Sequence, residues 1–186
     1  PDDLGALLET YYRPAVQALA DADIPVISAI NGPAVGAGLS FALAADIVVM
    51  ARSAYLMLAF ANIGLVPDAG ATWLIAKSAG RAKALEMALL GEKVAAEQAL
   101  DLGLVTRLAD DETVLADAMA IATKLARGPS VALGMIRKQV AAAVNSTLMD
   151  TFEIEKANQR AAGHTRDFRE AVNAFAEKRK PDFRGE

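Results

Sequence analysis

The sequence predicts an α/β core followed by a wholly helical C-terminal region. Up to about residue 128, short β-rich runs alternate with segments of helical spacing, which is typical of βαβ units. From residue 129 onward the apolar residues keep helical spacing alone. Because no Ser- or Pro-rich linker separates the two parts, we expect residues 129–186 to pack on the core of residues 1–128 or on a neighbouring subunit.

The first elements follow from hydrophobic spacing. Leucines and tyrosines at helical intervals predict an amphipathic helix over residues 3–21 that tolerates a bend at Pro14. A β-branched run predicts a buried strand at 26–30, and the glycine-rich, small-residue stretch after it predicts a tightly packed helix at 36–45. A second β-branched run predicts a strand at 47–51, which completes a βαβ unit.

The later elements are assigned by the same periods of apolar residues. The remaining expected elements of the core are strands at 55–60 and 104–108 and helices at 72–78, 81–90 and 95–102. Asp110 and Asp111 are expected to cap a helix that runs to about Ala126. The C-terminal helices are expected to be interrupted near Asn145 and Gly163.

Composition excludes several classes of function. The 186 residues carry a net charge of −4, and 54% of them are hydrophobic, so a large core and apolar subunit contacts are expected and a nucleic-acid partner is not. The chain has no cysteine and a single histidine, His164, which we expect in a surface turn and not in a metal site.

The long uncharged stretch before Asp46 is broken by Pro25 and by the turn at residues 31–33, which argues against a membrane span. Because the chain opens at Pro1 directly on a helical pattern, its natural N-terminus is expected upstream.

Asp68 is the first candidate for chemistry. It is a lone carboxylate in the apolar, glycine-punctuated run of residues 63–73, just before a predicted helix. Leu65, Val66 and Pro67 are expected to desolvate the charged form and to raise its pKa toward a value useful for proton transfer. A purely structural role as a helix N-cap is an alternative, and one residue can fill both roles.

The second candidate is the glycine turn at residues 36–38. Glycines between a strand and a helix let the backbone approach a ligand closely, and the N–H groups of Ala37 and Gly38 would point outward at the positive end of the helix dipole. Such a turn can bind a phosphate or a developing oxyanion. The turn lacks the Lys-Ser/Thr of a P-loop, and close packing of helix on strand is the structural alternative.

Four blocks of sequence together resemble the crotonase, or enoyl-CoA hydratase/isomerase, superfamily. They comprise residues 31–46, 63–73, 84–105 and 168–185. The resemblance implies the ββα spiral core of that family, with its N-terminal part missing from this chain, and a C-terminal helical region that builds a trimer or a dimer of trimers. It also implies an oxyanion hole for a thioester carbonyl, with the Ala37 N–H as its second donor and its first donor in an upstream segment outside this chain.

The resemblance also bears on the type of reaction. Hydratases of the family hold water between two glutamates, and the corresponding positions here are Ser40 and Phe60, neither of which is a base at neutral pH. Asp68 matches the position of the acidic residue in isomerases of the family. Within the family the resemblance is strongest to the branch that isomerises ring epoxides of phenylacetyl thioesters, which implies a proton shift or ring-epoxide isomerisation with Asp68 as acid/base.

The resemblance further implies the substrate and its contacts. The expected substrate is an acyl-CoA thioester, with coenzyme A as part of the substrate and no separate cofactor, and a cytoplasmic location in aromatic or fatty-acid catabolism. The residues expected to line the substrate site are Gly36, Gly38, Phe60, Leu65, Pro67, Trp73 and Lys178. Phe60 and Trp73 are equally well explained as core residues, and the basic run around Lys178 as a solvated face.

Two other functions stay open at this stage. One is a non-catalytic subunit that binds CoA thioesters. The other is a 2-enoyl-CoA hydratase with rearranged carboxylates, which would need Glu86, Glu92 or Glu97 beside the Ala37 N–H.

Overall fold

The computed structural model describes residues 3–186, and the chain divides into two compact units. The first unit comprises the chain up to Asp21 and Val26–Met119; the second comprises Ala22–Pro25 and Ala120–Glu186. The division falls within helix α6 (Val114–Ala126), whereas the expected boundary lies after it, at residue 128. None of the helices in residues 3–186 combines the length and apolar character that crossing a bilayer requires.

The N-terminal segment is helical from Leu4 to Asp21, one residue shorter than the predicted range of 3–21. Helix α1 (Leu4–Leu7) passes into a π-helical turn, η1 (Leu8–Tyr12), and then into α2 (Arg13–Asp21). The Asp3 carboxylate accepts the Ala6 N–H at 3.1 Å and caps the first turn. Pro14 follows directly on the π-helical turn, in which the Arg13 N–H is bound by the Leu8 carbonyl five residues back, and the helix continues past it.

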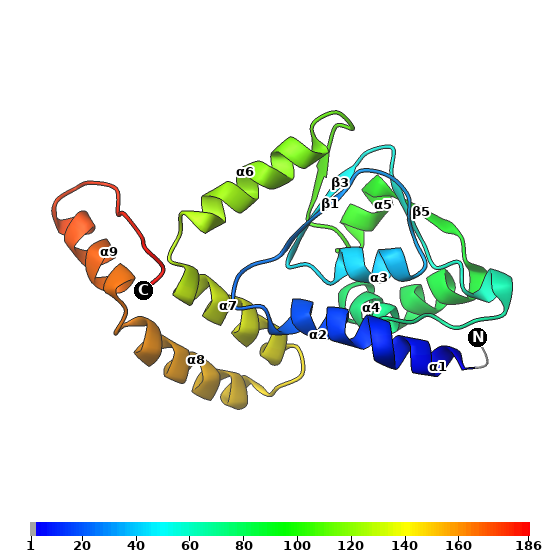
Figure 1. Ribbon diagram of the computed structural model, residues 1–186, viewed down its shortest axis with the longest axis horizontal. Coiled ribbons are helices and arrows are strands. Elements are labelled where there is room, and N and C mark those ends of the chain that lie inside the picture. Colours follow the sequence, from blue (N-terminus) through cyan, green and yellow to red (C-terminus); the bar gives the residue numbers. More distant parts are fainter. Residues whose placement is uncertain (1–2) are drawn as a thin grey trace. The chain divides into compact units, whose positions relative to one another are not determined.

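The first unit contains two small sheets (Figure 1). Strands β1 (Ile27–Ile30), β3 (Ile47–Ala51) and β6 (Arg107–Ala109) form a parallel sheet in the order β1-β3-β6. The central strand β3 is almost entirely buried, which explains its unbroken apolar sequence. In the second sheet, β4 (Tyr55–Met57) pairs in parallel with β2 (Ala34–Val35) and antiparallel with β5 (Lys93–Ala95).

The structure corrects several predicted strands. β2 and β5 were not predicted, because two or three residues are too short to show a period and both strands depend on pairing with β4. The strand predicted at 55–60 ends at Met57, since the chain then turns into the 3₁₀ helix η2 (Ala61–Ile63). The strand predicted at 104–108 is found at Arg107–Ala109.

The helices of the first unit begin and end close to their predicted limits. Helix α3 (Ala37–Leu43) packs against α4 (Ala71–Leu90), whose two halves meet at Gly80, where a φ of 81° interrupts the helical backbone. Helix α5 (Ala96–Asp101) follows β5 directly.

The predicted side-chain cap of α6 is wrong. The carboxylate of Asp110 lies 3.6 Å from the Arg52 guanidinium, and that of Asp111 accepts the Ser53 N–H at 3.1 Å. These tertiary contacts, which no local pattern records, take both side chains away from the helix start. The Asp110 carbonyl instead accepts the N–H groups of Thr113 and Val114.

The second unit is helical, as predicted. It contains α7 (Ser130–Ala143), α8 (Leu148–Ala162) and α9 (Arg166–Ala176), with interruptions at the expected places and an exposed His164 in the turn before α9. Helix α7 also holds the short segment Ala22–Pro25. The Arg137 guanidinium donates to the Ala22 carbonyl at 2.8 Å, and Lys138 pairs with Asp23.

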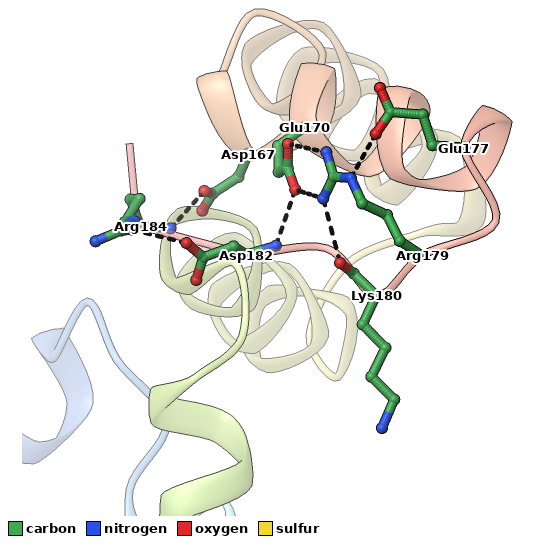
Figure 2. Close-up of polar contacts among 7 residues, drawn as sticks. All are labelled: Asp167, Glu170, Glu177, Arg179, Lys180, Asp182 and Arg184. Atoms are coloured by element: carbon green, nitrogen blue, oxygen red, sulfur yellow. Dashed lines mark hydrogen bonds and ion pairs between the residues drawn. The ribbon is translucent and has the colours of Figure 1, made fainter.

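The segment after α9 is fastened by two carboxylates of that helix (Figure 2). Asp167, buried on α9, accepts the backbone N–H groups of Arg184 and Gly185 at 2.7 and 2.9 Å. Glu170 binds the Arg179 guanidinium through both oxygens and accepts the Asp182 N–H. These bonds hold the pKa of Glu170 at about 2.

Candidate active site

The glycine turn places two N–H groups at the start of α3. Gly36, with a φ of 58°, donates its N–H to the Met57 carbonyl at 3.0 Å, which ties the helix start to β4. Its own carbonyl accepts the N–H groups of Leu39 and Ser40. Among the hydrogen bonds of residues 3–186, none uses the N–H of Ala37 or Gly38, which is the usual condition of first-turn donors. A hollow of about 320 Å³, bounded by residues 28–34, opens beside Gly38.

The Asp68 turn has an unusual backbone. Ala69 has a φ of 48° and Gly70 a φ of 88°, so two successive residues after Asp68 are left-handed. For Ala69 this conformation costs about 1 kcal/mol, because its Cβ crowds the following carbonyl. Such local strain persists only where neighbouring contacts hold the chain in place, and it is concentrated at functional sites.

The carboxylate of Asp68 is partly withdrawn from water. Its Oδ1 atom is buried, and within residues 3–186 no group forms a hydrogen bond to it. Burial raises the pKa of Asp68 above its ordinary value, since the charged form loses hydration without gaining a partner. The expected direction of the pKa shift is therefore found. Of the residues expected to cover the carboxylate, Pro67 is half-buried, but Leu65 and Val66 are 41% and 78% exposed.

Asp68 does not cap α4 through its side chain. Gly70 occupies the N-cap position, and the Ala71 N–H is bound by the main-chain carbonyl of Asp68 at 3.0 Å. The carboxylate is therefore free of the structural role that the sequence left open for it. An unpaired, partly buried carboxylate next to a strained backbone is a feature of sites that move protons.

Ser40 connects the two candidate motifs. Its side chain is fully buried on α3, and its hydroxyl donates to the Asp68 carbonyl at 3.0 Å. The helix that presents the Ala37 N–H thus also holds the Asp68 turn. From the sequence, Ser40 was considered only as a missing glutamate. The signal that would have revealed this bond is a lone hydroxyl between Leu39 and Phe41 in an otherwise apolar helix.

The other predicted substrate-site residues differ in their surroundings. Phe60 is buried, and its ring lies 3.8 Å from the position that a Cβ on Gly36 would take, so it packs directly under the glycine turn. Pro67 is half-buried. Trp73 is 48% exposed on α4, with the Lys77 ammonium 5.9 Å from its ring centroid.

Lys178 belongs to the second unit, just after α9. It is an exposed residue with a φ of 55°, and its N–H donates to the Phe175 carbonyl. The neighbouring Arg179 is bound by Glu170 and Glu177, which raises its pKa and occupies its guanidinium. Within the basic run from 178 to 180, the Arg179 guanidinium is therefore occupied by ion pairs within the protein.

The carboxylates required by a rearranged hydratase are engaged or exposed elsewhere. Glu86 pairs with Lys83 at 2.8 Å, and Glu97 pairs with Arg52 at 3.2 Å. Glu92 is exposed in the turn before β5. Among the four acidic residues considered for this site, Asp68 is therefore the one whose backbone is hydrogen-bonded to α3, the helix that follows the glycine turn.

Known proteins resemble the chain over almost its whole length. Over 183 residues the chain is 45% identical to the 1,2-epoxyphenylacetyl-CoA isomerase of Escherichia coli (strain K12), a match that covers 98% of this chain and 70% of that protein. It is 31% identical to the crystal structure of an enoyl-CoA hydratase from Polaromonas sp. JS666, with a TM-score of 0.92, covering 98% of this chain and 72% of that one. An enoyl-CoA hydratase/isomerase structure from Cupriavidus metallidurans CH34 is 33% identical, with a TM-score of 0.90, covering 100% of this chain and 69% of that one.

These likenesses confirm the predicted fold and the resemblance on which it depended. The model of the enoyl-CoA hydratase/isomerase family matches residues 4–186, which is almost the whole of the sequence. The fold is the crotonase fold, with a mixed α/β core and a helical C-terminal region. The chain therefore belongs to the enoyl-CoA hydratase/isomerase family of enzymes.

Proposed function

We propose that the protein isomerises acyl-CoA thioesters by a proton shift, with Asp68 as the acid/base. The observation that carries this proposal is the buried, unpartnered Oδ1 of Asp68 in a strained turn that Ser40 ties to α3. A carboxylate of raised pKa is a stronger base than an ordinary one. The same group can serve both steps of an isomerisation.

The reaction begins with removal of a proton from the carbon next to the thioester carbonyl. Negative charge then develops on the carbonyl oxygen, where the Ala37 N–H is the proposed donor at the positive end of α3. In a 3-enoyl thioester the charge is delocalised as a dienolate. The protonated Asp68 then donates its proton to the carbon at the end of the dienolate distant from the carbonyl. The double bond is now conjugated with the thioester carbonyl, and Asp68 is again an ionised carboxylate.

Hydration is the less favoured alternative at this site. The positions that hold water in the family's hydratases carry the Ser40 hydroxyl, which is fully buried and bound to the Asp68 carbonyl, and the buried ring of Phe60. Neither side chain can remove a proton from water at neutral pH. The similarity to an isomerase that acts on 1,2-epoxyphenylacetyl-CoA supports ring-epoxide isomerisation in phenylacetate degradation as the specific reaction. A non-catalytic thioester-binding subunit is the remaining alternative.

The proposed substrate contacts follow from the resemblance of the sequence motifs to the family. We assign the thioester to the turn of Gly36, Ala37 and Gly38, and the acyl group to the neighbourhood of Leu65, Pro67 and Trp73. A homotrimer or a dimer of trimers in the cytoplasm is part of the same proposal. The exposed apolar side chains on α7 and α8, among them Ile136 and Phe152, support apolar contacts between subunits.

A paired assay of wild type and Asp68→Asn tests the proposal. Isomerisation of a 3-enoyl-CoA and hydration of crotonyl-CoA would be followed in parallel. We expect isomerisation to fall by about 10²- to 10⁴-fold in Asp68→Asn and hydration to be negligible in both proteins. Hydration that survives the substitution would contradict the assignment. Binding of both thioesters without turnover of either would favour a binding subunit.

A further inference from the structure

A groove of about 280 Å³ lies beside the Asp68 turn and is not used by the reaction described above. Ala69 and Gly70 form one side of it, directly after the proposed acid/base. The N-terminal helical segment forms the other side. The groove therefore borders the backbone that directly follows the proposed acid/base.

The helical side of the groove has two parallel stripes. Leu8, Tyr12 and Val16 are spaced by four residues and form an apolar stripe. Each is followed by a polar residue, so that Glu9 and Arg13 form a second stripe alongside the first. The two carboxylate oxygens of Glu9 lie 2.8 and 3.0 Å from one Arg13 nitrogen. The two charges on this side of the groove therefore form an ion pair with no net charge.

Tyr12 is fixed in this groove by the helix of the glycine turn. Its ring meets that of Phe41 edge to face, with 5.6 Å between centroids. Phe41 is the neighbour of Ser40, which binds the Asp68 carbonyl. Two consecutive residues of α3 thus hold the two sides of the groove. Tyr12 also ends the π-helical turn η1, and such turns occur frequently at functional sites.

The size and lining of the groove fit one particular occupant. An apolar cavity of about 150 Å³ accommodates a benzene ring, so this groove has room for a ring and its substituents. Its apolar stripe and paired charges do not provide an unpaired charge for a phosphate or a carboxylate. We propose that the groove receives the end of the acyl group distant from the thioester, and that Tyr12 is the residue that favours ring-bearing acyl groups over short linear ones. This inference rests on the proposed function and adds the residue that selects the acyl group.

The test measures binding without turnover, using phenylacetyl-CoA and acetyl-CoA as probes. Wild type should bind phenylacetyl-CoA at least about tenfold more tightly, and Tyr12→Ala should lose about that factor while keeping its affinity for acetyl-CoA. Tyr11→Ala is the matched control, because Tyr11 is 66% exposed and lies outside the groove. Val16→Trp provides a second variant that fills the groove instead of emptying it, and it should also abolish the preference.

The outcomes separate this inference from the function beneath it. A ring preference that is lost in Tyr12→Ala and Val16→Trp but kept in Tyr11→Ala supports the inference. Normal binding of both thioesters with an unchanged preference in the groove variants overturns the inference and leaves the proposed function standing. Failure of wild type to bind either thioester would overturn both.

Discussion

The bond from Ser40 to the Asp68 turn predicts a specific pair of defects in Ser40→Ala. The substitution removes one hydroxyl from a fully buried site and leaves the Asp68 carbonyl with a single remaining donor, the Ala71 N–H. Because that carbonyl keeps one partner, the loss is that of an ordinary hydrogen bond and not of an orphaned group. We expect the free energy of unfolding to fall by about 1 kcal/mol, which corresponds to roughly 2–4 °C in melting temperature.

The effect on catalysis should be larger than the effect on stability. Without the Ser40 bond, the strained backbone at Ala69 can relax and carry the carboxylate of Asp68 away from its working position. A displacement of about 1 Å in a reacting group costs up to about 10²-fold in rate. We therefore expect kcat to fall by about 10- to 100-fold with little change in KM, since no thioester contact is removed.

The assay compares Ser40→Ala with Ser146→Ala. Ser146 also donates its hydroxyl to a backbone carbonyl, that of Ala142 at 2.9 Å, but it is exposed and lies in the second unit. Steady-state isomerisation and urea unfolding would be measured on both variants. If Ser40→Ala loses stability but keeps the wild-type kcat, the bond does not position Asp68 and the reasoning is refuted.

Three further predictions concern stability. Because the folded-state pKa of Asp68 is raised, its ionisation destabilises the fold at pH values above the folded pKa. The variant Asp68→Asn should therefore have a slightly higher melting temperature than wild type at pH 7. This difference in melting temperature should vanish as the pH falls below about 4. The pKa of Glu170 is lowered by folding, so its ionised carboxylate stabilises the fold at pH values above its unfolded pKa, and this stabilisation is lost as the pH falls toward 2. The variant Glu170→Gln should therefore have a lower melting temperature than wild type at pH 7. The difference in melting temperature should shrink below pH 4.5. Gly134→Ala would place a Cβ 2.1 Å from the Asp23 carbonyl oxygen, so α7 or its contact must shift, and urea titration should show a loss of about 1–3 kcal/mol.

Local patterns in the sequence predicted the longer elements because each has its own period. The break at Gly80 and the strand at 47–51 were both found where they were predicted. β5 was missed because its three residues become a strand only by pairing with β4. The cap at Asp110 and Asp111 was wrong for a related reason: Arg52 and Ser53, remote in sequence, bind those carboxylates.

The candidate site was predictable in its residues but not in its connections. Asp68 and the glycine turn were identified because a lone carboxylate in an apolar turn and a glycine-rich helix start are both visible locally, whereas the role predicted for Ala37 came from the resemblance to the family. The bond from Ser40 and the contact between Tyr12 and Phe41 join residues that are 28 and 29 positions apart. No spacing rule covers such distances. The positive φ of Ala69 was equally hidden, because alanine gives no sign of a left-handed conformation.

The fastening of the segment after α9 determines where that region can vary in sequence. Asp167 and Glu170 hold the N–H groups of residues 182, 184 and 185, and every non-proline residue supplies such a donor. Side chains at 182 and 184 can therefore be exchanged without loss of these bonds. Gly185 is an exception, because a Cβ there would lie 2.3 Å from the Ser130 hydroxyl. A peptide of equal length grafted over residues 182–184 would keep these attachments as long as it has no proline at 182 or 184 and the two acids of α9 remain.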